Sequence, residues 1–124
     1  MIRRYDIGVE LRVWFGALAG PLAWACQHVF GYGLTEAGCD PGGRRWGVPI
    51  DTLTAIATAA AALIAVLGLI VAIGVFRANE HEAPPPEGRR FFLGAIGVLV
   101  NPLFLCIVLM SGIGSIVLDN CHQA

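Results

Sequence analysis

The segment PLAWACQHVF, residues 21–30, places three side chains capable of chemistry in a row: Cys26, Gln27 and His28. Thiolate and imidazole groups bind copper and zinc, and histidine is also a common axial ligand of haem. An ionisable residue inside an apolar helix is a candidate for function. The segment therefore raises two alternatives: a cofactor site or a set of polar contacts between helices.

A cofactor held by this chain alone meets two obstacles. Cys26 and His28 lie two positions apart, so on a helix they project about 200° apart and cannot face one ion together with Met110. A haem held by histidines from two helices would need a second histidine, yet His28 is the one histidine in the apolar runs, and His122 is near the tail. We expect no cofactor and no metal in this chain alone.

The sequence also lacks the common catalytic signatures. It contains no nucleotide-binding loop, no metalloprotease motif and no recognisable catalytic triad. We therefore expect that the protein is not an enzyme.

Hydrophobicity indicates which elements carry the polar triplet. Of 124 residues, 56% are hydrophobic and 14% are charged, whereas soluble domains average about 25% charged residues. The uncharged runs 13–34, 52–76 and 91–118 contain 22, 25 and 28 residues, and roughly 20 residues cross a membrane as a helix. We predict an all-α integral membrane protein whose three transmembrane helices form a single membrane domain, residues 1–124.

The distribution of arginine predicts an orientation. Three spans put the termini on opposite sides, and positively charged segments stay in the cytoplasm. Six arginines share the side of the N-terminus, and two lie in the loop 35–51. We predict a multi-pass protein of the bacterial inner (plasma) membrane with a cytoplasmic N-terminus and a periplasmic or extracellular C-terminus. The two groups are Arg3, Arg4, Arg12, Arg77, Arg89 and Arg90, and Arg44 and Arg45.

The four cysteines divide by depth. Cys39 and Cys121 follow the first and third apolar runs on the side expected to be oxidising, where disulfides persist. We predict a disulfide between them, with two free thiols or a bond to a partner as the alternatives. Cys26 and Cys106 would lie about 12 and 18 Å below that surface, and at these different depths we expect both to be free.

Small and polar residues recur at helical spacing in each apolar run, and we call them the small-residue stripe. Such stripes let membrane helices approach closely. Gln27 and Asn101 lie on the stripe, and an amide in hydrocarbon needs hydrogen-bond partners. We expect inter-helix or partner contacts from Gln27, His28 and Asn101, with neutral His28 donating to a neighbouring helix or another subunit. The stripe comprises Gly16, Gly20, Ala23, Gln27, Asp51, Thr54, Thr58, Ala61, Ala65, Gly68, Ala72, Gly94, Gly97 and Asn101.

Three short motifs carry a resemblance to a known group. The segments WFGALAGPLAW (residues 14–24) and NPLFLCIVLM followed by LDNC, together with Cys39, make the chain resemble small three-span proteins encoded beside bacterial haem–copper cytochrome c oxidases. The resemblance covers nearly the whole chain. It implies an accessory subunit or assembly helper of a respiratory complex, without catalytic residues to carry over. Of the two we expect a non-catalytic accessory subunit of a respiratory membrane complex, such as cytochrome c oxidase or its supercomplex. Its partners would be larger membrane subunits and the lipid bilayer, without nucleic acid.

Two other functions remain open at this point. One is a membrane assembly protein that binds a redox group, a quinone or a metal through His28. The other is a small self-associating transporter or channel, which the absence of charge from the three runs disfavours.

Overall fold

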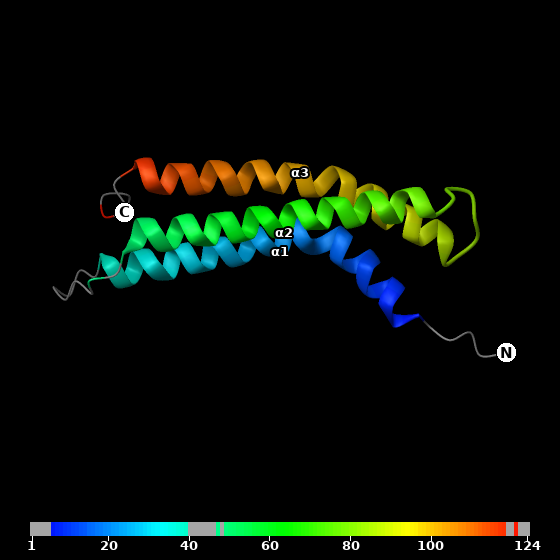
Figure 1. Ribbon diagram of the computed structural model, residues 1–124, viewed down its shortest axis with the longest axis horizontal. Coiled ribbons are helices and arrows are strands. Elements are labelled where there is room, and N and C mark those ends of the chain that lie inside the picture. The colour runs from blue at the N-terminus through cyan, green and yellow to red at the C-terminus, as the bar shows by residue number, and fades with distance from the viewer. Residues whose placement is uncertain (1–5, 40–46, 48, 119–120, 122–124) are drawn as a thin grey trace.

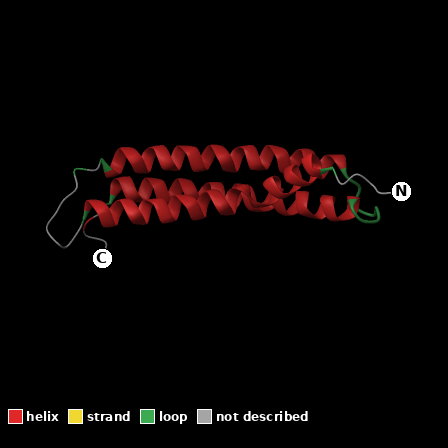
Figure 2. Cartoon of the chain, turned by 90° about the horizontal axis from the view of Figure 1, so that it is seen from below, coloured by secondary structure: helices red, strands yellow, loops and turns green. Residues whose placement is uncertain are grey.

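Three long helices make up the described part of the chain. The computed structural model describes residues 6–39, 47, 49–118 and 121. Figures 1 and 2 show the helices running alongside one another in alternating directions, with the termini at opposite ends. Each helix contacts both others, so the all-α prediction is confirmed. The helices are α1 (Ile7–Gly38), α2 (Ile50–Ala78) and α3 (Glu87–Val117).

The helix ends follow local capping chemistry. Asp6 precedes α1, and its side chain accepts a hydrogen bond from the Gly8 amide at 3.1 Å, which satisfies one of the unpaired first-turn donors. Pro49 and Pro86 precede α2 and α3, where a missing amide hydrogen costs nothing. Each helix is longer than its apolar run: α1, α2 and α3 contain 32, 29 and 31 residues, against runs of 22, 25 and 28.

Two of the described helices, α2 and α3, are long and apolar enough to cross a membrane. In each, 22% of the most apolar 18-residue window is buried, whereas the core helix of a soluble protein is mostly buried. α1 is not one of these two helices, because Pro21, Gln27, His28 and several glycines dilute its apolar residues. Helix length and composition therefore support two of the three predicted spans, and the span formed by α1 stays a prediction.

The core is made of small side chains, and the large ones lie outside. The largest fully buried side chains are Val13, Val108 and Asn101. Trp14 and Phe15 are 45% and 41% exposed, although water-soluble proteins bury such residues. The bundle thus has small residues between its helices and large apolar residues on its outer surface.

The small-residue stripe forms the contacts between the helices. Every stripe residue is buried except Asp51, which is exposed at the start of α2. On α3 the buried face continues to Val108 and Gly112. The approach is close: a Cβ added to Gly94 would lie 2.8 Å from the Phe76 nitrogen. The interpretation of the stripe as a packing surface is confirmed.

A disulfide closes one end of the bundle. Cys39 and Cys121 are bonded, with 5.4 Å between their Cα atoms, and they join the C-terminal ends of α1 and α3. Cys26 and Cys106 are free and exposed on the outer surface. The structure thus contains the predicted pairing.

Replacing Gly68 with alanine should destabilise the bundle, because the new Cβ would meet the Ala19 side chain and lie 3.0 Å from Asn101 Oδ1. We expect a loss of about 1 to 3 kcal/mol in the free energy of unfolding, as for other overpacked sites. Circular dichroism during titration with a denaturing detergent would measure it. Gly74→Ala is the matched control on α2, since nothing lies within 4 Å of a Cβ there. Equal stabilities for the two variants would contradict the packing account.

Peptide mapping without reducing agent should recover Cys39 joined to Cys121. Cys26 and Cys106 should carry an alkylating label after solubilisation, because both thiols are free and exposed. A linkage that uses Cys26 or Cys106, or an intermolecular linkage through Cys39, would contradict the pairing.

Candidate functional site

Asn101 lies at the point where the three helices meet. It is fully buried on α3. Its Nδ2 donates to the carbonyl oxygens of Gly16 at 2.6 Å and Gly97 at 2.8 Å, and its Oδ1 accepts from the Gly20 amide at 2.8 Å. Both donor hydrogens and the acceptor oxygen of the amide are therefore used. The side chain ties α3 to the backbone of α1.

The two α1 groups held by Asn101 belong to one helical turn. In a regular α-helix the Gly20 amide donates to the Gly16 carbonyl, and here both groups bond to the Asn101 side chain. Pro21 follows directly and supplies no amide hydrogen to the Ala17 carbonyl. Figure 1 shows the N-terminal part of α1 set at an angle to the rest of the helix. An inserted side chain and a proline are established causes of such a bend.

Glycine is required around Asn101 because backbone occupies the space. A Cβ on Gly20 would lie 2.8 Å from Asn101 Oδ1, and one on Gly97 would meet the Gly16 carbonyl oxygen. Any larger residue at these positions would separate α1 from α3 and stretch the amide contacts. The glycines of the stripe and the asparagine thus form one unit.

Gln27 makes a second polar contact between the helices. It is 8% exposed, and its Nε2 donates to Thr58 Oγ1 at 2.9 Å and to the Val108 carbonyl at 3.1 Å. The Val108 carbonyl can only accept, which fixes the nitrogen of the amide on that side. Gln27 Oε1 is buried without a hydrogen-bond partner. Leaving such an acceptor unpaired costs about 1 to 3 kcal/mol.

Glu10 forms a third polar contact, which the sequence reasoning missed. Its side chain is 6% exposed and forms salt bridges with Arg89 at 2.7 Å and Arg90 at 3.0 Å. Arg90 Nε also donates to Glu10 Oε1, at 3.1 Å. The contact fastens the beginning of α1 to the beginning of α3. The available signal was an acidic residue just before the first apolar run and an arginine pair just before the third.

His28 points away from the stripe. It is exposed, and its ring stacks on Trp24 with 5.6 Å between ring centroids. Trp24 in turn contacts Phe104 of α3, also at 5.6 Å. A hydrogen bond from His28 to a neighbouring helix of this chain is not present among the described residues, so a contact with another subunit stays a prediction.

The three predicted contact residues therefore separate into two groups. Gln27 and Asn101 lie between the helices, and His28 lies on the outer surface. Within residues 6–39, 47, 49–118 and 121, no three histidine, cysteine or acidic side chains gather as metal ligands. His122 and the arginines at positions 3, 4, 44 and 45 lie outside the described residues.

Comparisons of the chain with protein-family models, curated proteins and solved structures gave no match.

Replacing Asn101 with leucine should weaken the bundle more than its similar size suggests. The change removes three hydrogen bonds and leaves backbone groups of Gly16 and Gly20 against an apolar side chain. We expect a loss of at least about 2 kcal/mol in the free energy of unfolding in detergent. Leu99→Ala, on the exposed face of α3, is the control and should stay within about 0.5 kcal/mol of wild type. A neutral Asn101→Leu would refute the role assigned to the amide.

Proposed function

We propose that this chain is a non-catalytic accessory subunit of a respiratory membrane complex, crossing the bacterial inner membrane three times. Its three helices would be fixed among themselves by buried polar contacts, and its outer surface would face lipid and larger membrane subunits. The resemblance to proteins encoded beside cytochrome c oxidases supports an oxidase or its supercomplex as the partner.

The surface of α1 supports the third span. Large apolar side chains project outward along its whole length, as they do on α2 and α3: Leu11, Trp14, Phe15, Leu18, Leu22, Val29 and Phe30 are 41–71% exposed. In water such a surface would aggregate, whereas in hydrocarbon it is satisfied. The polar residues that lower the apolarity of α1 are partly hidden: Gln27 is bonded to α2 and α3.

The ends of the bundle support the orientation. The described arginines Arg12, Arg77, Arg89 and Arg90 all lie at the end where α1 and α3 begin. The disulfide lies at the opposite end. Arginine favours the cytoplasmic side, and disulfides persist on the oxidising side. The N-terminus would then be cytoplasmic and Cys121 periplasmic or extracellular.

The observation that carries the proposal is that Asn101 and Gln27 form hydrogen bonds between the helices, whereas His28 lies on the outer surface. The Asn101 side chain forms hydrogen bonds with backbone groups, and Gln27 Nε2 donates to Thr58 and Val108. These side chains therefore hold the three helices together. His28 remains on the outer surface beside Trp24 and Phe104. An imidazole facing hydrocarbon lacks a hydrogen-bond partner, and a neighbouring subunit can supply one.

Replacing His28 with leucine should therefore loosen the chain from its complex. One hydrogen bond between membrane helices contributes about 0.6 to 2 kcal/mol, or roughly 3- to 30-fold in association. His28→Gln, which keeps a donor, should retain more binding. Leu63→Val, at a residue of α2 that is 59% exposed, is the control. Co-purification in mild detergent, with the partner's cofactor spectrum recorded, provides the measurement.

Two results would contradict the proposal. Wild-type chain that runs alone in mild detergent would remove the accessory role. Loss of a haem or copper signal in His28→Leu at unchanged assembly would instead indicate a cofactor-binding assembly protein that uses His28.

A further inference from the structure

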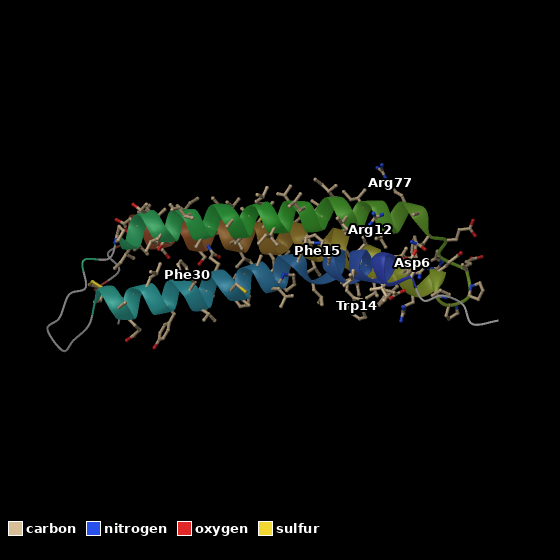
Figure 3. The ribbon with its side chains drawn as sticks, turned by 60° about the horizontal axis from the view of Figure 1, so that its bottom comes forward. Asp6, Arg12, Trp14, Phe15, Phe30 and Arg77 are labelled. Carbon is tan, nitrogen blue, oxygen red and sulfur yellow. A yellow bond between two sulfur atoms is a disulfide. The ribbon has the colours of Figure 1, made fainter. Side chains whose placement is uncertain are left out.

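An apolar groove of about 1060 Å³ runs between α1 and α2 on the outer surface. Its lining includes three alanines of α2, and large side chains of α1 border it. Figure 3 shows two of the latter, Phe15 and Phe30, well separated along α1. His28 does not line this groove, so the groove is a different part of the surface from the His28 region.

The groove is long on its α1 side and short on its α2 side. The lining residues of α1 run from Leu11 to Phe30, which at 1.5 Å per residue is about 28 Å. Those of α2 run from Ala57 to Ile64, which is about 10 Å. The hydrocarbon core of a membrane is about 30 Å thick, and a lipid chain stays in one leaflet. An occupant that follows the α1 lining from end to end would continue through both leaflets, as a transmembrane helix does.

The shape of the groove also suits a helix. On the α2 side the groove is lined by alanines at positions 57, 60 and 61, whose side chains are short. Small residues let the backbone of a second helix approach closely. The same chemistry joins α2 to α1 and α3 on the adjoining face, where Ala65, Gly68 and Ala72 are buried.

Gln27 gives the groove a requirement for a hydrogen-bond donor. The residue lines the groove and is more than nine-tenths buried. Its Nε2 is engaged by Thr58 and Val108, and its Oε1 has no partner. A hydrocarbon chain has no donor to offer. A helix with a serine, threonine or other donor side chain at this depth would satisfy the oxygen, which is buried here, once the Gln27 side chain turns toward the groove.

We propose that the α1–α2 groove binds one transmembrane helix of a larger partner subunit, which donates a hydrogen bond to Gln27 Oε1. This inference rests on the proposed accessory function and adds to it the docking surface and the chemistry of the docked segment. α1 then lies between partner contacts, with the helix on one side and the His28 contact on the other.

Filling the groove tests the proposal. In Ala60→Trp the indole occupies the α2 side of the groove and blocks a helix. Ala59→Trp is the matched control, because Ala59 is also exposed, adjacent in sequence and outside the groove lining. Membranes of the native host are solubilised in mild detergent, and the size of the particle that contains the chain is measured by native electrophoresis. We expect at least a tenfold loss of the large particle for Ala60→Trp and none for Ala59→Trp.

Formation of the Cys39–Cys121 disulfide in each variant checks that the fold is intact. Retention of the large particle by Ala60→Trp would overturn the groove proposal while leaving the accessory function standing. A wild-type chain outside any large particle would instead remove the accessory function itself. The two failures are therefore distinguishable.

Photo-crosslinking identifies the occupant directly. A diazirine amino acid of aliphatic shape replaces Ile64, which lines the groove, or Leu63, which is 59% exposed outside it. The Ile64 probe should give an adduct that maps to an apolar, helix-length segment of another membrane protein, and the Leu63 probe should give lipid adducts. Lipid adducts alone from Ile64, or an adduct with a second copy of this chain, would overturn the proposal.

Discussion

The carboxamide of Asn101 is the interaction on which the shape of the bundle depends. It satisfies one carbonyl and one amide of α1 at the turn before Pro21 and one carbonyl of its own helix. These bonds require the backbones of α1 and α3 to lie within reach of one asparagine side chain, and Gly20 and Gly97 leave room for that approach because they carry no side chains. Gly16 does the same for the contact between α1 and Ala72 of α2. Asn101 and the glycines depend on each other. Without the glycines the Asn101 amide could not reach the α1 backbone and would be unpaired in an apolar interior, and without the amide the close contact would lose its hydrogen bonds.

This interior leaves the outer surface to the large apolar residues. With alanine and glycine between the helices, the bulky residues of all three helices point outward. Helices in lipid gain little from burying leucine against leucine, so contacts come from small residues and a few hydrogen bonds. A chain of 124 residues thereby keeps a broad apolar outer surface. Asn101 and the Gln27 nitrogen are bonded within the bundle. Under the proposed function, His28 and Gln27 Oε1 would be the groups left for a partner.

Much of this could be predicted from the sequence, because helical spacing determines which residues share a face. Spacing identified the stripe and placed Gln27 and Asn101 on it. His28 is one residue further along than Gln27, and a rotation of about 100° per residue carries it off that face. Its position on the outer surface therefore also follows from helical spacing. The disulfide followed from the depth of the cysteines. The partners of Asn101 could not be predicted, since backbone groups of Gly16 and Gly20 carry no sequence signature.

The pairing of Glu10 was missed for another physical reason. Orientation rules give acidic residues little weight, and its arginine partners lie 79 and 80 residues away along the chain. Only the fold brings the starts of α1 and α3 together. Asp51 shows the reverse error, since its spacing matched the stripe while its position at the first turn of α2 left it exposed.

The central claim is that α1 crosses the membrane with α2 and α3, although it is the least apolar of the three helices. The most direct test is to place a small protease-cleavable tag at each terminus and digest intact spheroplasts, with lysed membranes as the control. Three spans predict that the C-terminal tag is cleaved in spheroplasts and the N-terminal tag only after lysis. Cleavage of both tags in spheroplasts, or protection of both, would mean an even number of spans and would contradict the account.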